Sequence, residues 1–160
     1  EALMAGGVLG ENITMVKELE RIGHKIPVGV TYVSRVPASA KMMGPAGETV
    51  YTVDYVYLEN SPEAKGFMDK LEKYLSPEER ARVNRYTFTG YSAARALFAA
   101  MDRCGKALTW DCTNAELAKI SNLETGAMTP ISFSATDHLA APKLFLLKAD
   151  PAASTYKLAP

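Results

Sequence analysis

Residues able to do acid–base or metal chemistry are sparse in this chain of 160 residues. The two histidines, His24 and His138, lie far apart, and neither has zinc-site spacing to a cysteine or to the other histidine. The adjacent carboxylates Glu78 and Glu79 fall in the first turn of an expected helix, where the helix dipole explains them. No serine lies in the G-x-S-x-G turn of hydrolases. The residues therefore offer no catalytic constellation, and we expect neither a metal nor a cofactor.

One glycine-rich turn has a pattern that can bind a ligand. Gly6, Gly7 and Gly10 stand between an apolar strand end at 2–5 and an amphipathic helix at 11–22. Backbone N–H groups at such a turn can face an anionic group, and glycine permits close approach. The spacing is not that of the G-x-G-x-x-G dinucleotide motif, and a tight turn alone would also account for these glycines. A ligand-facing role and a purely structural role both stay open.

Two cysteines, Cys104 and Cys112, bracket a short segment between two expected helices. Their spacing is neither C-x-x-C nor that of a zinc site. A disulfide between them would close a small loop and stabilise the fold by about 2–3 kcal/mol through loop entropy. Two reduced thiols are the alternative that the spacing alone leaves open.

Composition places the chain among globular proteins with one domain-sized core. Hydrophobic residues make up 48% and charged residues 22% of the sequence. Lysine and arginine total 18, as do aspartate and glutamate, so no basic surplus exists to neutralise phosphates and nucleic acid is not an expected partner. No apolar run reaches the length of a membrane span, and residues 1–7 lack the basic and apolar regions of a signal peptide.

Hydrophobic periodicity predicts alternating strands and helices. Turn and cap signals support the helix starts, above all Ser61-Pro62 and the capping box from Ser76 to Glu79. This alternation favours a layered α/β fold. Strands are expected at 26–33, 49–58 and 143–147, helices at 11–22, 61–75, 92–103 and 113–120, a short helix with loops at 36–47, and an alternating strand-like stretch at 86–91.

The succession of elements in the chain resembles a known family. The run Tyr86-Thr87-Phe88-Thr89-Gly90-Tyr91 leads into the helix at 92–103, followed by the short helix and the closing apolar strand at 143–147. Together with the Gly6-Gly7 turn, this order resembles the C-terminal half of type I periplasmic binding proteins, the branched-chain amino-acid receptor family of ABC importers. The match covers essentially the whole chain and rests on joint order and spacing. It implies an α/β fold of Rossmann-like three-layer lobes, present as a partial chain, that binds small molecules and catalyses nothing.

The resemblance also implies ligand-binding residues in the first part of the chain. In the family, the residue after the paired glycines and a residue past the following strand face the ligand. These positions fall on Val8 and Tyr32, with Gly7, Leu9 and Thr31 beside them.

A further ligand contact is implied in the second part of the chain. The aromatic residue before the Gly-Tyr helix start lies over the ligand in the family and falls on Phe88, with Tyr86 as its neighbour. Since the family is exported to an oxidising compartment, the resemblance also favours the Cys104–Cys112 disulfide over reduced thiols.

One departure from the family bears on the ligand. Amino-acid receptors of the family place a carboxylate past the second strand, where it pairs with the ligand's ammonium. Tyr32 holds that position, and no acidic residue occurs between Glu20 and Glu48. Because an unpaired buried ammonium is costly, an aromatic or short organic acid is expected in preference to an amino acid. Val8, Tyr32 and Phe88 would line its pocket.

The family's chains are much longer than this one, and their first lobe is missing here. We expect 1–49 and 128–147 to belong mainly to the second lobe, 50–123 mainly to complete the first, and 148–160 to form a tail. Such a fragment would expose sheet edges and core. The missing N-terminal lobe is then an expected partner within the same protein.

The leading prediction is the periplasmic, extracytoplasmic solute-binding component of an ABC importer. The resemblance implies export with a signal peptide, closure of two lobes on a small organic ligand, and delivery to a membrane permease. A ligand-sensing module of the same fold in a regulator or receptor is the second interpretation. An unrelated small α/β enzyme is the third, and it would need a clustered acid–base pair.

Overall fold

The computed structural model describes residues 1–140 and 143–160, and the chain divides into two compact units. Unit 1 comprises Glu1–Asp54 and Phe145–Pro160, and unit 2 comprises Tyr55–Leu144. This division differs from the expected one in three ways. Residues 50–54 belong to unit 1, residues 128–144 belong to unit 2, and the expected tail at 148–160 completes unit 1. The reason is strand pairing, because the C-terminal segment pairs with the sheet of unit 1 from Phe145 onward.

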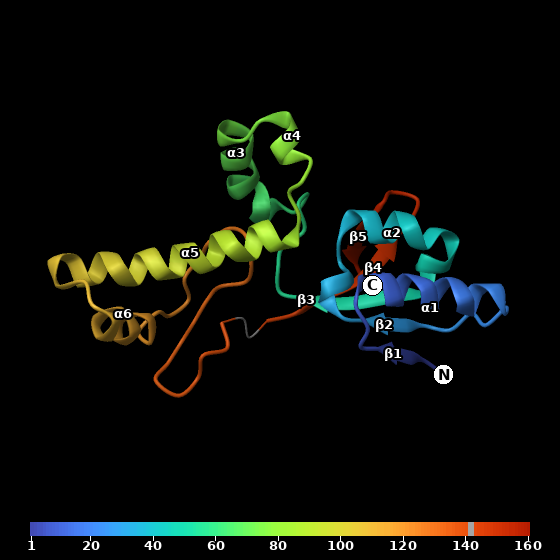
Figure 1. Cartoon of the computed structure of the whole chain (residues 1–160), viewed down its shortest axis with the longest axis horizontal. Helices are drawn as coiled ribbons and strands as arrows, with labels where there is room; N and C mark the ends of the chain where they lie inside the picture. The colour runs from blue at the N-terminus through green and yellow to red at the C-terminus, as the bar shows by residue number, and fades with distance from the viewer. Residues whose placement is uncertain (141–142) are drawn as a thin grey trace. The chain divides into compact units, whose positions relative to one another are not determined.

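Unit 1 is built on a mixed five-stranded sheet in the order β1-β2-β3-β4-β5. The first three strands are parallel, and the last two are antiparallel to their neighbours. Figure 1 shows β4 and β5, coloured red, beside the elements from the start of the chain. The strands are β1 (Leu3–Ala5), β2 (Val28–Val30), β3 (Val50–Asp54), β4 (Phe145–Asp150) and β5 (Thr155–Leu158).

The strands of unit 1 bury one face of the sheet. Alternation along β2 and β3 places Val28, Val30 and Val50 in the core, while Val53 points to the exposed face. Helices α1 (Leu9–Arg21) and α2 (Pro37–Met43) contribute further apolar side chains to this core, among them Ile13, Val16, Ala40 and Met43. Two 3₁₀ turns, Tyr32–Ser34 and Gly44–Thr49, complete the unit.

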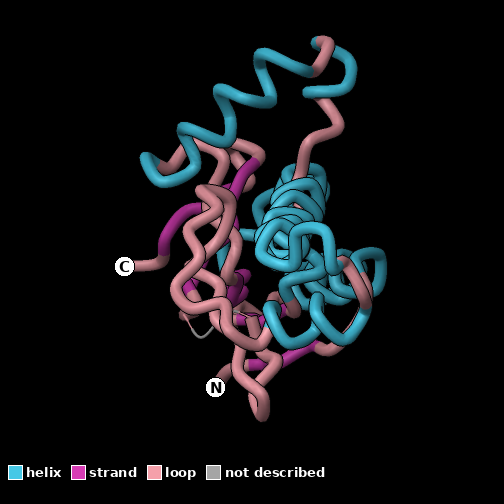
Figure 2. The backbone as a smooth tube through the Cα atoms, turned by 90° about the vertical axis from the view of Figure 1, so that its left-hand side faces the viewer, coloured by secondary structure: helices cyan, strands magenta, loops and turns pink. Residues whose placement is uncertain are grey.

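Unit 2 is helical, with long loops. In the described part of this unit, residues 118–140 form no helix and pair only through two isolated bridges, Val56 with Met128 and Leu123 with Ile131; these loops are pink in Figure 2. Its core contains Val56, Phe67, Phe88, Ile120 and Ile131. The helices are α3 (Lys65–Tyr74), α4 (Pro77–Arg80), α5 (Arg85–Cys104) and α6 (Trp110–Leu117), with 3₁₀ turns at Pro62–Ala64 and Gly105–Ala107.

The local signals predicted some helix starts and missed others. The capping box is confirmed, because Ser76 accepts from the Glu79 N–H while Glu79 accepts from the Ser76 N–H. The strand-like stretch at 86–91 was wrong, since those residues form the first turns of α5. The helix begins early because Asn84 caps it, accepting a 2.9 Å hydrogen bond from the Tyr86 N–H. Among the helices that the structure describes, none is long and apolar enough to cross a bilayer.

Candidate ligand-binding site

The candidate site lies at the carboxyl ends of two parallel strands in unit 1. Ala5, the last residue of β1, pairs with Val30, the last residue of β2, so the strands end level with each other. The segments that follow, Gly7–Leu9 and Thr31–Ser34, are joined by a 3.3 Å hydrogen bond from Thr31 Oγ1 to the Gly7 carbonyl. In open α/β sheets, ligands bind outside the carboxyl ends of the strands. The structure thus brings together the predicted residues of the first part of the chain.

The glycine turn is shaped by close packing around Gly7. Its carbonyl also accepts a 2.8 Å hydrogen bond from Asn12 Nδ2. A Cβ at this position would lie 2.9 Å from both Asn12 Oδ1 and Glu11 Oε2, whereas Gly6 and Gly10 have nothing within 4 Å. The approach of the α1 side chains therefore favours glycine at position 7, which is a structural reason independent of any ligand.

The start of α1 carries a carboxylate that sequence reasoning did not include in the site. The Val8 N–H donates a 3.0 Å hydrogen bond to Glu11 Oε2. One amide expected to face an anionic ligand is thus bound by the chain's own carboxylate. The available signal was a glutamate three residues after the N-cap position Val8, as in a capping box. The Val8 side chain itself is 64% exposed, and Leu9 is half-buried.

The second turn presents an aromatic side chain. Residues Tyr32–Ser34 form a 3₁₀ turn in which the Ser34 N–H donates to the Thr31 carbonyl at 3.0 Å. Tyr32 is 41% exposed, while Ser34 is fully buried and its Oγ accepts a 2.7 Å hydrogen bond from Asn12 Nδ2. Asn12 Nδ2 therefore donates a hydrogen bond to each of the two turns, to the Gly7 carbonyl and to Ser34 Oγ. The exposed side chains of Val8 and Tyr32 project from turns that a buried polar link holds together.

A buried ion pair lies directly after the second turn. Arg35 Nη1 is 2.9 Å from Asp54 Oδ2, and the two side chains are 3% and 0% exposed. Asp54 is the last residue of β3, so the pair connects the turn to a third strand end. Charge-assisted hydrogen bonds of this kind are short and directional. They fix the backbone that follows Tyr32.

The second pair of predicted contacts lies in unit 2. Phe88 is fully buried, with its ring centroid 4.7 Å from that of Phe67 in an edge-on arrangement. Tyr86 is 51% exposed, and the Arg85 guanidinium lies 5.1 Å from its ring centroid. The two aromatic side chains thus differ in environment because they lie on a helix. The Phe88 ring belongs to the core of unit 2, whereas Tyr86 offers exposed surface.

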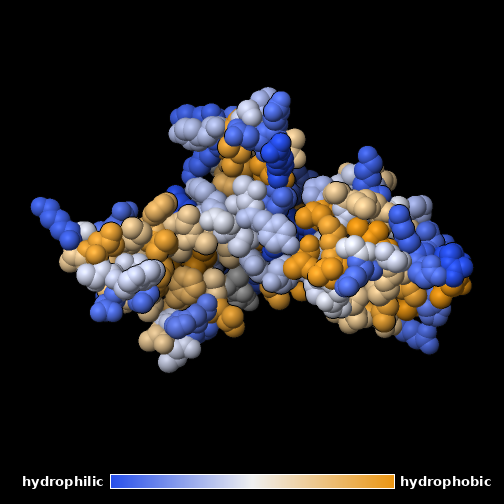
Figure 3. All heavy atoms as spheres, in the orientation of Figure 1, coloured by the Kyte–Doolittle hydropathy of each residue, from blue (hydrophilic) through white to orange (hydrophobic). Residues whose placement is uncertain are grey.

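Each unit also has an apolar groove at its surface, and Figure 3 shows apolar residues exposed on both units. In unit 1 a shallow groove follows α1 past Val8, Met15 and Ile22. In unit 2 a groove of about 470 Å³ is lined mainly by apolar side chains of α5 and the loops, with His138 among them. No group of three metal-ligating side chains occurs in residues 1–140 and 143–160.

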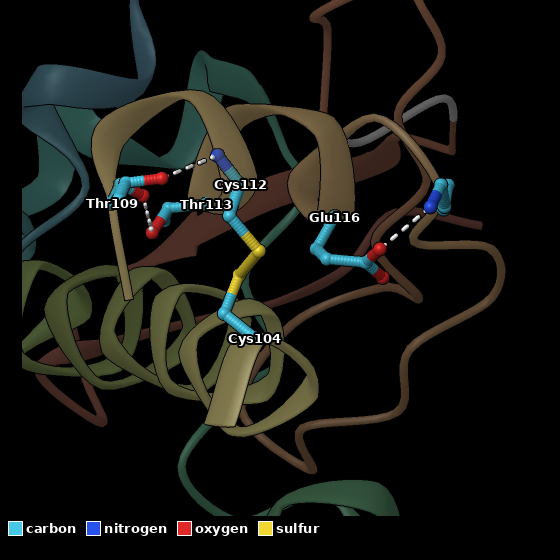
Figure 4. Close-up of a disulfide and its surroundings, with 6 residues drawn as sticks. Cys104, Thr109, Cys112, Thr113 and Glu116 are labelled. Carbon is cyan, nitrogen blue, oxygen red and sulfur yellow. Dashed lines mark hydrogen bonds and ion pairs between the residues drawn. A yellow bond between two sulfur atoms is a disulfide. The ribbon is translucent and has the colours of Figure 1, made fainter. Parts of the chain in front are cut away.

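The two cysteines are bonded to each other in unit 2. Cys104, at the end of α5, and Cys112, in α6, form a disulfide with a Cα–Cα distance of 6.0 Å (Figure 4). Thr109 caps α6 by accepting a 3.2 Å hydrogen bond from the Cys112 N–H. Thr113 Oγ1 donates back to the Thr109 carbonyl at 2.8 Å. The disulfide thus links the end of α5 to α6, and the Thr109 cap stabilises the start of α6.

The mixed sheet with joined turns at its parallel strand ends places this chain in the class of α/β binding folds. The chain belongs to the periplasmic binding protein family, whose sequence profile matches residues 1–155. This is a family of binding proteins and not of enzymes. No curated protein matches the chain.

Solved structures of larger proteins share the fold. A branched-chain amino acid ABC transporter protein from Thermus thermophilus with bound valine is similar at a TM-score of 0.82 and 18% identity, over 100% of this chain and 45% of that one. A leucine binding protein from Thermotoga maritima has a TM-score of 0.76 at 18% identity, over 99% and 43%. A fatty acid ABC transporter substrate-binding protein from Thermomonospora curvata has a TM-score of 0.74 at 17% identity, over 99% and 41%. The chain spans less than half the length of these proteins.

Proposed function

We propose that this chain is part of the periplasmic solute-binding component of an ABC importer, which delivers a small organic ligand to a membrane permease. The carrying observation is the pair of turns, Gly7–Leu9 and Thr31–Ser34, joined at the carboxyl ends of β1 and β2. Membership in a binding-protein family supports this reading. The alternative, a ligand-sensing module of a regulator or receptor, would be identified by an attached output domain.

The ligand has an apolar or aromatic body in this proposal. Val8 and Tyr32 expose large side chains from the two turns, and burying them against a ligand is favourable. On the resemblance drawn from the sequence, Tyr32 takes the place of a carboxylate that amino-acid receptors of the family have. This substitution supports an aromatic or short organic acid.

A second ligand class is favoured by Glu11. Its carboxylate lies at the Val8 N–H and has lone pairs left to accept from an ammonium group. An anionic ligand group at the same turn would meet like charge. Among the similar structures, one holds valine and another is named for fatty acid transport, so a ligand with an amino group and a carboxylic acid without one both occur in these names. An amino acid with an apolar side chain is the second candidate.

A matched ligand pair separates the two classes. Leucine and 4-methylpentanoate share an apolar body and differ in the amino group, and a family-length protein carrying this chain is titrated with each by calorimetry. Glu11→Gln keeps an oxygen for the Val8 N–H and removes the charge, with Glu18→Gln two turns along α1 as its control. An organic-acid site binds 4-methylpentanoate more tightly and gains affinity for it in Glu11→Gln. An amino-acid site binds leucine and loses it in that variant.

The turns themselves are tested by tyrosine truncation. Tyr32→Ala is expected to weaken binding at least tenfold, about the effect of losing one well-buried aromatic contact. Tyr74→Ala removes a 72% exposed tyrosine of unit 2 and serves as the control. Equal affinity in the wild type and Tyr32→Ala would show that the ligand does not bind at these turns. A protein that binds no small solute would contradict the proposed function.

A further inference from the structure

The C-terminal strand β5 reaches the second turn through one buried side chain. The Tyr156 hydroxyl donates a 3.1 Å hydrogen bond to the Ser34 carbonyl and lies 2.8 Å from Ser39 Oγ. Ser39 Oγ in turn lies within hydrogen-bond distance of the Ser34 carbonyl and of the Val36 carbonyl at 2.7 Å. Tyr156 is 3% exposed, and both serines are fully buried. The Ser34 carbonyl thus accepts from the Tyr156 hydroxyl and has the Ser39 hydroxyl beside it, and both hydroxyl groups are buried.

The same serine continues the connection to the glycine turn. Ser34 Oγ accepts from Asn12 Nδ2 at 2.7 Å, and Asn12 Nδ2 also donates to the Gly7 carbonyl at 2.8 Å. A continuous buried path therefore runs from Tyr156 through Ser34 and Asn12 to Gly7. Every member of this path has a hydrogen-bond partner, and no buried side-chain nitrogen or oxygen is left without one in the described residues. Fully satisfied buried networks rigidify the segments that they join.

We propose that Tyr156 is a positioning residue for the ligand site. Its hydroxyl fixes the 3₁₀ turn that presents Tyr32 and, through Ser34 and Asn12, sets this turn against Gly7. Tyr156 controls ligand affinity in this way without touching the ligand. The inference rests on the proposed function for the site, but the rigidity of the turn is a property of the chain without ligand.

Tyr156→Phe is the sharpest perturbation because it keeps the buried ring and removes only the hydroxyl. Leu147→Val is the matched control: Leu147 lies on the adjacent strand, is fully buried, and loses one methylene without any polar contact. Ser39→Ala removes the second hydroxyl at the Ser34 carbonyl and provides an independent test should the phenylalanine variant fold poorly. All are made in the family-length protein that carries this chain.

Two measurements are made on each variant. Without ligand, amide hydrogen exchange is followed at Ser34 and Arg35, whose N–H groups close the turn on the Thr31 and Tyr32 carbonyls. With ligand, the dissociation constants of leucine and 4-methylpentanoate are measured well below the melting temperature. We expect Tyr156→Phe to speed the exchange of both amides about tenfold and to weaken binding about 3- to 10-fold, as losing one net hydrogen bond does. Leu147→Val should change neither quantity.

The outcomes separate this inference from the proposed function. Unchanged exchange at Ser34 and Arg35 in Tyr156→Phe overturns the positioning role, whatever the ligand. Faster exchange with unchanged affinity also overturns it, because the turn would then not set binding. If Leu147→Val lost as much affinity as Tyr156→Phe, the cause would be general destabilisation of the fold, and the positioning role would be overturned. A wild-type protein that binds neither probe contradicts the proposed function, while the exchange measurement still decides whether Tyr156 holds the turn.

Discussion

Removing the Cys104–Cys112 disulfide should destabilise unit 2 by an amount set by its short loop. The two cysteines are 8 residues apart and join the end of α5 to α6. The loop-entropy relation for a ring of this size gives about 2.5 kcal/mol at 25 °C. We therefore expect the Cys104→Ala/Cys112→Ala variant to lose about 2.5 kcal/mol of unfolding free energy, because its unfolded chain is no longer constrained.

Urea unfolding followed by circular dichroism at 222 nm measures this loss. Wild type treated with a reductant should unfold like the double variant, because both lack the same covalent link. Thr109→Ala keeps the disulfide but removes the cap of α6, and it should lose about 1 kcal/mol. A loss below about 0.5 kcal/mol in the double variant would refute the entropic reasoning. It would mean that the unfolded chain already holds the ends of α5 and α6 together.

The remaining predictions concern unit 1. Arg35→Met takes the guanidinium away from the buried Asp54 carboxylate and should cost about 3–5 kcal/mol in urea unfolding; a loss below about 1 kcal/mol would contradict it. Gly7→Ala places a methyl group 2.9 Å from Asn12 Oδ1, so it should cost about 1–3 kcal/mol, and a neutral effect would show that the turn adjusts freely. Burial raises the pKa of Tyr156 above its usual value near 10, although the hydrogen bond with Ser39 opposes the shift. The neutral phenol is therefore the form that the fold favours. Its stabilisation is complete below pH 10 and is lost as the pH rises through the raised pKa. A stability–pH curve should decline more steeply in the wild type than in Tyr156→Phe, in which only Tyr57 keeps a pKa raised by burial among the tyrosines with this shift.

Local sequence signals predicted the elements where neighbours in the chain decide the structure. The capping box from Ser76 to Glu79 and the valine-rich strand around Val50 both depend on adjacent residues. The stretch at 86–91 misled because alternating aromatic and threonine residues have high strand propensity. The Asn84 cap and the packing of Phe88 on Phe67 outweigh that propensity. Strand β5 was missed because four residues depend on a partner strand for their structure.

The residues of the candidate site also fall into two groups, those that local sequence signals could place and those that depend on distant partners. The place of Gly7 after a strand end could be predicted from the apolar run before it. The expected strand at 26–33 ran through Tyr32, and only the resemblance put this residue past the strand, which ends at Val30. The polar residues that join the turns could not be predicted, since Asn12 is 22 positions from Ser34 and Tyr156 is 122 positions from it. A hydroxyl or amide carries no sign in the sequence of which distant carbonyl it will meet. Glu11 was visible only as a helix-start residue.

The pairing of Asp54 with Phe145 has a consequence for how the chain folds during synthesis. The polypeptide leaves unit 1 at one of these residues and returns at the other, so all of unit 2 is inserted between two cross-strand neighbours. Unit 2 is complete before β4 and β5 have been made, and chains fold their earlier parts first as they emerge. Once folded, unit 2 shortens the loop that β3 and β4 must close, which lowers the entropy opposing their pairing. Tyr156 reaches its place only after all of unit 2 has been made, so the nascent chain acquires an ordered Thr31–Ser34 turn only once β5 has emerged.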